Sequence, residues 1–282
     1  MGSISKTYDG TSVATLTPSN FLLFGFVNGN GASVAQTTGT FASVEAGTRI
    51  VVSTTLSAAD FLANPGTDLS NYVLPTSAVG AIGTILAAPL TITYVASPAR
   101  RTYGQSNSLL TGTVIASGLV GPDVLSTVTS GRAAFTSTAD LTSNGGNYAV
   151  TGSGLIGASR NYTYTFTQAS ANFSALAVTP ASLIVYYVAD QAQRRVGQAV
   201  GTLSGSTLAI GLVNGDALGS VTSGTAVFAT NATAASGPGN YAITGSGLNG
   251  ASANYAIRFL QAPSNSFGYS VLRAPRSGAG RI

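Results

Sequence analysis

The chain has 282 residues, enough for two or three domains, and only 7% of them are charged. A hydrophobic fraction of 44%, with 12 Tyr and 11 Phe, supports a packed core and argues against a disordered chain. The net charge of +4 comes from 12 basic and 8 acidic residues, with Lys6 as the single lysine and the arginines scattered, so nucleic-acid binding is not expected. No apolar run approaches the ~20 residues of a membrane span, so no transmembrane segment is expected.

The first 88 residues are predicted to form one diverged module. Residues 24–29 are similar to residues 118–120 and 211–215, and Asn71-Tyr72 is similar to Asn147-Tyr148, but the spacing between these motifs differs. Residues 56–62 are the best candidate for a single helical turn. We therefore expect a relative of the later modules rather than a copy of them.

Two copies of one module follow. Residues 115–137 align without a gap to residues 208–230, and residues 146–155 align to residues 239–248, at one offset of 93 residues. The same offset relates Gly118 to Gly211, Asp123 to Asp216, Phe135 to Phe228, Tyr148 to Tyr241 and Gln168 to Gln261. Self-similarity at a fixed period indicates repeated structural units.

Within each copy the pattern is that of short strands. β-branched runs at 90–96 and 183–189 follow Pro89 and Pro180, which suit the start of a strand. Apolar and polar residues alternate at 146–154 and 162–167, and glycine- and asparagine-rich turns separate the segments. Strands with this spacing indicate a sandwich, and the long period disfavours a solenoid with coils of about 20 residues.

The predicted fold is therefore all-β, with tandem immunoglobulin-like β-sandwich modules in an elongated array. We predict modules at 1–88, 89–180 and 181–275, with a tail or linker at 276–282.

Short motifs in each module carry a family resemblance. Lys6-Thr7-Tyr8-Asp9-Gly10-Thr11 resembles the opening of the YDG module, and Asn71-Tyr72 fits its later part. Residues 90–179 and 183–275 look like the MBG, or mostly bacterial immunoglobulin-like, module, through RTYGQ at 101–105, GLVGPD at 118–123, GNYAVTGSGL at 146–155 and NYTYTF at 161–166. The second copy carries RVGQ at 195–198, so the tyrosine is lost there.

The resemblance implies a place in filamentous-haemagglutinin-like, two-partner-secreted adhesins. It implies an extracellular or outer-surface location on a Gram-negative bacterium, an outer-membrane secretion partner for the parent protein, and host or matrix glycans as candidate ligands. It implies no catalytic or ligand-binding residues. We expect a monomeric fragment that serves as a stalk or adhesive segment in cell adhesion and biofilm, with a carbohydrate-binding or, less favoured, an ice-binding module as the alternative.

The residue inventory argues against an enzyme. There is no His and no Cys, so Ser-His-Asp and Cys-His sites are excluded, and no metal site or cofactor is expected. Asp123 and Asp216 recur at one module position beside Gly or Pro, which favours a turn role over a paired-carboxylate site. The Gly-Ser-Gly segments at 152–154 and 245–247 favour a bulge or tight turn over a phosphate loop.

Two groups of basic residues are the candidates for a binding or modification role. Arg100-Arg101 and Arg194-Arg195 occupy nearly equivalent positions, shifted by one residue, where guanidinium groups suit an acidic polysaccharide. The alternative, which we favour, is that they are solvated charges at a sheet edge. Lys6, with a nearby Asn or Asp, is a weak candidate for an intramolecular isopeptide crosslink.

Overall fold

The computed structural model describes residues 2–275, so the predicted tail or linker at 276–282 lies outside the described residues. The chain divides into two compact units, each described by itself below. Residues up to 96, with 111–135 and 151–170, make the first unit, and residues 97–110, 136–150 and 171 onwards make the second. The units divide the segment 89–180 between them, so the module limits proposed from the sequence stay predictions.

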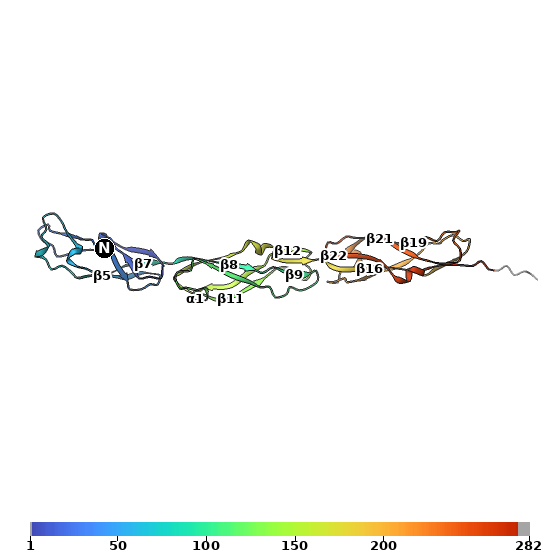
Figure 1. Cartoon of the computed structure of the whole chain (residues 1–282), viewed down its shortest axis with the longest axis horizontal. Coiled ribbons are helices and arrows are strands. Elements are labelled where there is room, and N and C mark those ends of the chain that lie inside the picture. Colours follow the sequence, from blue (N-terminus) through green and yellow to red (C-terminus); the bar gives the residue numbers. More distant parts are fainter. Residues whose placement is uncertain (1, 276–282) are drawn as a thin grey trace, which may run out of the picture. The chain divides into compact units, whose positions relative to one another are not determined.

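The N-terminal part of the first unit contains a five-stranded sheet in the order β1-β7-β5-β4-β2 and a small sheet, β3-β6 (Figure 1). Its elements are β1 (Ile4–Thr7), β2 (Val13–Thr15), η1 (Pro18–Asn20), β3 (Ala32–Val34), β4 (Thr38–Phe41), β5 (Gly47–Thr55), η2 (Ala58–Asp60), β6 (Phe61–Ala63), η3 (Leu69–Asn71) and β7 (Ser77–Leu86). The turn η2 falls inside the segment expected to be helical. Ser57 N–H donates to Asp60 Oδ2 at 2.7 Å and so caps this turn.

The rest of the first unit comprises the sheets β10-β8-β14 and β11-β13. Its elements are β8 (Ala88–Ala96), β10 (Gly112–Ser117), α1 (Leu125–Val128), β11 (Thr129–Thr136), β13 (Thr151–Gly157) and β14 (Tyr162–Gln168). The central strand β8 pairs antiparallel with β10 and parallel with β14.

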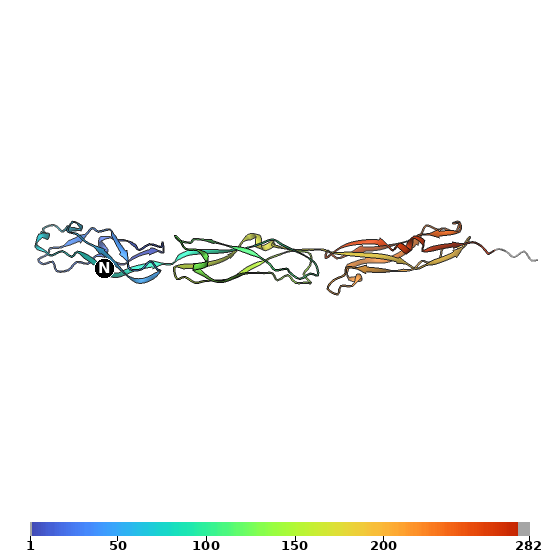
Figure 2. The same cartoon turned by 60° about the horizontal axis from the view of Figure 1, so that its bottom comes forward.

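The second unit repeats this pattern. Its sheets are β12-β15-β9, β18-β16-β22, β17-β23-β20 and β19-β21, seen from a second direction in Figure 2. Its elements are β9 (Ala99–Thr102), β12 (Gly146–Tyr148), η4 (Ser170–Ser174), β15 (Leu176–Thr179), β16 (Ala181–Ala189), β17 (Ala192–Arg195), β18 (Gly205–Ile210), α2 (Leu218–Val221), β19 (Thr222–Thr230), β20 (Gly239–Tyr241), β21 (Ile243–Gly250), β22 (Tyr255–Gln261), η5 (Pro263–Phe267) and β23 (Tyr269–Leu272). The strand β16 pairs antiparallel with β18 and parallel with β22, as β8 does with its neighbours.

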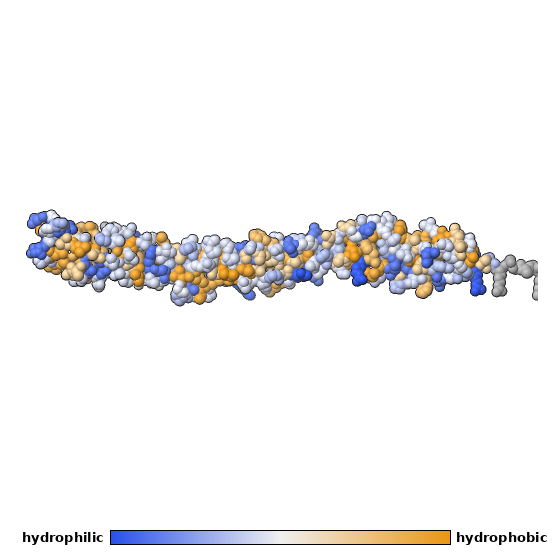
Figure 3. All heavy atoms as spheres, turned by 45° about the horizontal axis from the view of Figure 1, so that its top comes forward, coloured by the Kyte–Doolittle hydropathy of each residue, from blue (hydrophilic) through white to orange (hydrophobic). Residues whose placement is uncertain are grey.

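Buried and more exposed side chains alternate along the two central strands, and the buried ones build the core. In β8 and in β16 every second residue is buried, including Leu90 and Ile92 in one and Leu183 and Val185 in the other. Figure 3 shows that apolar residues, in orange, also reach the surface in several separate patches. The most exposed of them are Val73, Leu109 and Phe24.

The Gly-Ser-Gly segments at 152–154 and 245–247 lie within strands β13 and β21 and not in turns. In the second copy the register of β19 against β21 shifts between Gly224 and Val227. A Cβ on Gly224, whose φ is +86°, would lie 2.2 Å from Gly247 O, so only glycine fits this close approach of two strands. The bulge therefore lies in β19, where two residues oppose Gly247, and the Gly-Ser-Gly segment at 245–247 is the regular strand across from it.

The predicted fold class is confirmed: the chain is all-β and built from tandem β-sandwich modules. Asn71 ends η3 and Tyr72 follows it, so this Asn-Tyr pair does not lie in a strand as Asn147-Tyr148 of β12 does. Tyr72 OH accepts a hydrogen bond from Asn30 Nδ2 at 2.8 Å.

Candidate functional site

Three turns of the chain are built alike, one after β1, one after β9 and one after β17. Each of these strands pairs in parallel with a later strand, β7, β15 or β23. The residue that follows the strand then donates its backbone N–H to that neighbour: Tyr8 to Leu86 O at 2.8 Å, Tyr103 to Thr179 O at 2.8 Å, and Val196 to Leu272 O at 2.9 Å. Two turns therefore present a tyrosine at the same place, and the third presents a valine.

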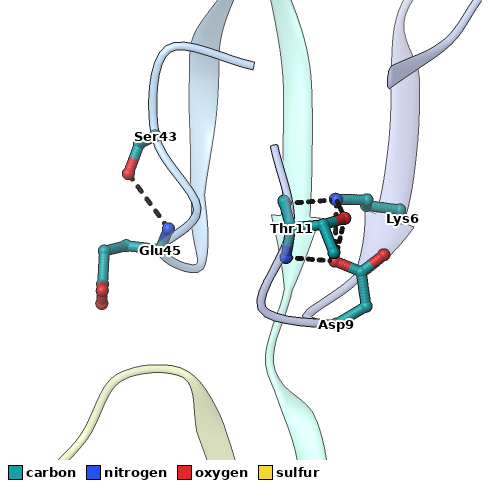
Figure 4. A network of polar contacts seen from close by, with 5 residues as sticks. All are labelled: Lys6, Asp9, Thr11, Ser43 and Glu45. Carbon is teal, nitrogen blue, oxygen red and sulfur yellow. Dashed lines mark hydrogen bonds and ion pairs between the residues drawn. The ribbon is translucent and has the colours of Figure 1, made fainter. Parts of the chain in front are cut away.

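A cation two residues before this position holds each turn together. In the first turn Lys6 Nζ donates to Asp9 Oδ1 at 2.8 Å and to Thr11 Oγ1 at 3.0 Å, as Figure 4 shows. Thr11 N–H also donates to Asp9 Oδ1, at 2.9 Å. The hydrogen bond from Lys6, and then that from the Thr11 backbone, lower the pKa of Asp9 to about 2. The turn is thus closed by an ion pair that persists across the neutral range.

Arginine takes the place of this lysine in the other two turns. Arg101 and Arg194 are each 5% exposed. Arg101 donates from Nε to Asn107 Oδ1 at 2.8 Å, from Nη1 to Gln105 O at 2.9 Å, and from Nη2 to the carbonyl of Asp140. Arg194 donates from Nη1 to Arg195 O at 2.9 Å and from Nη2 to the carbonyl of Thr233. The guanidinium groups therefore tie each turn to a loop 39 residues further along the chain.

The tyrosine of the first turn meets an aspartate from the loop after β10. Tyr8 OH donates to Asp123 Oδ2 at 3.1 Å, and Tyr162 OH donates to the same oxygen at 2.6 Å. Val120 N–H donates to Tyr162 OH at 2.9 Å. The rings of Tyr8 and Tyr162 meet edge to face, with centroids 5.6 Å apart.

The second turn meets a second aspartate in the same way. Tyr103 OH donates to Asp216 Oδ2 at 3.1 Å, and Tyr255 OH donates to it at 2.7 Å. Val213 N–H donates to Tyr255 OH at 3.0 Å, and the rings of Tyr103 and Tyr255 lie 5.5 Å apart at 77°. We call each of these sites a tyrosine–aspartate junction: Tyr8, Asp123 and Tyr162 form the first, and Tyr103, Asp216 and Tyr255 form the second.

Asparagines add a second contact to each junction. Asn161 Oδ1 accepts from Ala46 N–H at 2.8 Å in the first, and Asn254 Oδ1 accepts from Gly145 N–H at 2.9 Å in the second. Asn254 Nδ2 also donates to Asn144 Oδ1 at 2.8 Å. Each junction therefore joins segments that are more than 100 residues apart in sequence.

Burial raises the pKa of Tyr8, Tyr162 and Tyr255. Burial, and then the hydrogen bond to Asp123, raise the pKa of Tyr162 to about 12. The same two causes raise the pKa of Tyr8, and burial is the largest cause that raises the pKa of Tyr255. At neutral pH these three phenols are therefore protonated and donate hydrogen bonds to the aspartates.

Asp123 and Asp216 were predicted as turn residues, without a binding partner. Asp123 and Asp216 do lie in turns, with their N–H groups donating to Val120 O and Val213 O. The hydrogen bonds from two tyrosines to each carboxylate were not expected. A signal was available, because an offset of 93 relates Asp123, Tyr162 and their preceding Asn161 to Asp216, Tyr255 and Asn254.

The two arginine pairs are displaced by one residue relative to each other, so only one arginine of each pair coincides between the copies. Arg101 and Arg194 are equivalent at the common offset of 93, since they pair with Val178 and Val271 in matching strands. Both side chains are buried, so the description of them as solvated edge charges was wrong. Arg100 and Arg195 are exposed, and a ligand-binding role for any of the four stays a prediction.

The geometry around Lys6 is that of an ion pair. The nearest carboxylate, that of Asp9, is 52% exposed and has a lowered pKa, whereas amide formation requires a neutral amine and a protonated acid in apolar surroundings. Glu45 lies in a neighbouring loop, with its N–H donating to Ser43 Oγ at 3.0 Å (Figure 4). This arrangement gives no support to a crosslink at Lys6.

Across residues 2–275, no three side chains of the metal-binding types His, Cys, Asp and Glu lie together, and no helix has the length and apolarity needed to cross a bilayer.

Comparison with known families gives two matches. Residues 90–173 and 185–263 match the family described as MBG domain (YGX type). The chain belongs to the MBG family. Residues 1–79 match the YDG domain. No curated protein and no solved structure matches the chain.

The tyrosine–aspartate junctions give these motifs a structural meaning. Tyr103-Gly104-Gln105 carries the Tyr-Gly pair of the MBG type, and Tyr8-Asp9-Gly10 is the tripeptide of the YDG domain. In both, the tyrosine is the residue that enters a junction. In the second MBG copy Val196 replaces it, so that turn has no phenol to donate.

Proposed function

We propose that the chain is a non-catalytic stalk segment of a large, secreted bacterial surface adhesin, located outside the cell or on the outer surface of a Gram-negative bacterium. The observation that carries this proposal is that the same tyrosine–aspartate junction is built twice in one chain. A stalk needs successive modules whose ends dock on one another, and a repeated, buried junction supplies that property.

The chemistry of the junctions suits an extracellular spacer. Each junction combines hydrogen bonds to a carboxylate with an aromatic contact, and none requires a metal, a disulfide or a cofactor. Membership in a family of repeated modules supports the same role.

A glycan-array screen of the folded chain at physiological salt tests the stalk role. We expect no saturable binding to any glycan class. Saturable binding to one class would replace the stalk with the alternative, a carbohydrate-binding segment, for which Arg100 and Arg195 are the exposed candidates. In that case Arg100→Ala or Arg195→Ala would abolish binding, and Arg132→Ala, at another exposed arginine, would not.

A further inference from the structure

The second MBG copy has apolar side chains on the outer face of its sheet β18-β16-β22. The central strand β16 points Leu183 and Val185 into the core, so the residues between them point to the other side of the sheet. On that side, two rows of three residues lie next to each other across the strands. One row is Leu208, Tyr186 and Leu260, and the other is Ile210, Ile184 and Arg258. We call these six residues the apolar face.

The apolar face is open to solvent. Leu208 is 54% exposed and Ile210 is 53% exposed. None of the six residues is among those that pack against the buried cluster of Leu183 and Val185. Apolar surface that extends over several neighbouring side chains marks an interaction site, whereas single exposed apolar residues need no explanation.

The first MBG copy shows that the fold does not require this face. At the offset of 93 residues, its equivalent rows are Ile115, Thr93 and Thr167, and Ser117, Thr91 and Thr165. Five of these six residues are Ser or Thr, and none of the six in the apolar face is. Thr93 Oγ1 and Thr167 Oγ1 also share a hydrogen bond of 2.9 Å. The same sheet is therefore built with a polar outer side in one copy and an apolar one in the other.

The sequence of β16 is typical of a strand that is covered on both sides. Residues 183–188, LIVYYV, form an unbroken apolar run, whereas residues 90–95 of β8, LTITYV, alternate with threonine. Unbroken apolar runs are typical of strands buried on both faces, and alternation is typical of strands with one face in water. Within residues 2–275 the outer side of this sheet stays exposed at Leu208 and Ile210, so its cover has to come from another molecule.

We propose that the apolar face pairs with the apolar face of a second molecule of this chain. Arg258 is the single charged member of the face and lies in the edge strand β22, so the face has no charge pattern that would select a different protein. The row of Leu208, Tyr186 and Leu260 has a leucine on either side of a tyrosine. A two-fold axis along β16 therefore places Tyr186 against Tyr186 of the other molecule, and Leu208 against its Leu260.

This axis also keeps the two arginines apart. The two Arg258 side chains lie on opposite edges of the pair, ~10 Å apart across the strands and ~10 Å apart between the sheets. Their separation exceeds the Debye length of ~8 Å at physiological salt, so they repel each other little. Each Arg258 covers Ile210 of the other molecule with its aliphatic part, while its guanidinium reaches solvent. An axis across the strands would instead bring both arginines to the same edge, so we infer that the two β16 strands run parallel.

The size of the face sets the strength of the pair. Three strands ~4.8 Å apart, with about six residues of ~3.3 Å each, present roughly 300 Å² in plan. A standard protein interface covers ~800 Å² on each partner. The pair is therefore weak and reversible, and the chain is monomeric when dilute. This inference goes beyond the stalk role and does not rest on it, since a glycan-array result leaves it unchanged.

Sedimentation equilibrium of the full chain, from micromolar to millimolar concentration, tests the proposal. We expect a reversible monomer–dimer equilibrium with a Kd on the order of 0.1–1 mM. Tyr186→Thr combined with Leu260→Thr introduces the residues of the first copy and should weaken the dimer at least about tenfold. The control, Leu109→Ser combined with Ile156→Thr, removes two side chains that are 90% and 64% exposed elsewhere, and should leave the Kd unchanged.

A crosslink through a single introduced cysteine tests the geometry, because the chain contains no cysteine. Position 186 lies on the two-fold axis, so Tyr186→Cys should form disulfide-linked dimers at least about tenfold faster than Thr93→Cys, at the equivalent position of the first copy. If the double threonine variant does not fold, as judged by circular dichroism, this comparison decides the matter. A chain that stays monomeric up to millimolar concentration, an unchanged Kd in the folded double threonine variant, or equal crosslinking rates would each overturn the proposal.

Discussion

Asp123 and Asp216 each accept hydrogen bonds from two phenols, one on either side of a junction. Because the tyrosines are almost completely buried, an unpaired hydroxyl there would lose its bonds to water without replacement. The aspartate supplies the acceptor, and hydrogen bonds to a charged group are the stronger kind. Each aspartate and its two tyrosines therefore stabilise the fold as one unit.

Removal of the Tyr103 hydroxyl tests one of these bonds. Tyr103→Phe keeps the ring but leaves Asp216 with one donor fewer, so we expect the free energy of unfolding to fall by about 1–3 kcal/mol. Tyr148→Phe is the control, because it removes a hydroxyl that bonds to Asn144 O at the surface, and about 0.5 kcal/mol or less is expected. Urea unfolding followed by circular dichroism measures both. Equal losses in the two variants would show that the Tyr103 hydroxyl contributes no more to stability than the surface hydroxyl of Tyr148.

The raised pKa of Tyr162 predicts a loss of stability in alkali. In the unfolded chain this tyrosine ionises near pH 10, whereas in the folded chain it stays protonated until about pH 12. The unfolded state therefore binds fewer protons between these values, and the free energy of unfolding falls as pH rises from about 10 to about 12.

Comparison of pH slopes isolates this contribution from those of other tyrosines. Tyr162→Phe removes the titrating group, so its free energy of unfolding should fall less steeply over the same pH window. The free energy of unfolding is measured by urea titration at each pH. If it fell equally steeply with pH in the two proteins, the assigned role of Tyr162 would be contradicted.

At the scale of elements, the turn after β9 requires a glycine at position 104. Gly104 has φ +82°, and a Cβ there would lie 2.4 Å from Val213 Cγ2, in the loop that carries Asp216. The equivalent Gly197 has φ +81° but no atom within 4 Å of such a Cβ. The two glycines therefore share their backbone strain and differ in the contact across the junction.

This pair gives a matched substitution test. Gly197→Ala should cost about 1–2 kcal/mol for the left-handed backbone alone. Gly104→Ala should cost that amount and a further ~1–3 kcal/mol, because the methyl group overlaps Val213. Thermal unfolding of both variants measures the difference. Equal costs would mean that the turn and the Val213 loop do not pack in solution.

Sequence periodicity predicted the strands well because alternation depends only on nearby residues. The central strands at 90–96 and 183–189 were recognisable from local pattern and repeat, whereas the bulge expected at 245–247 lies in the opposing strand β19. The junctions were not, because Tyr103 and Asp216 are 113 residues apart and no local pattern states which turn faces which loop. The role of Arg101 and Arg194 was hidden for a similar reason, because their burial depends on contacts with the loops at Asp140 and Thr233, 39 residues further along the chain.

At the scale of the whole molecule, the two junctions use separate residues. Tyr8 and Asp123 belong to the first compact unit, and Tyr103 and Asp216 belong to the second. Because they share no partner, Tyr8→Phe and Tyr103→Phe should act independently, and the double variant should lose the sum of the single losses within about 0.5 kcal/mol. Urea titrations of the three variants check this. A much larger combined loss would show that the junctions are coupled.

The central claim, that a tyrosine from one turn docks on an aspartate from another loop, is tested most directly by a double-mutant cycle on Tyr103 and Asp216. The cycle compares the free energies of unfolding of the unmodified chain, Tyr103→Phe, Asp216→Ala and the double variant. We predict a coupling energy of about 1 kcal/mol or more, in the range of residues in direct contact. Strict additivity of the two substitutions would contradict the junction and, with it, the account of how these modules are joined.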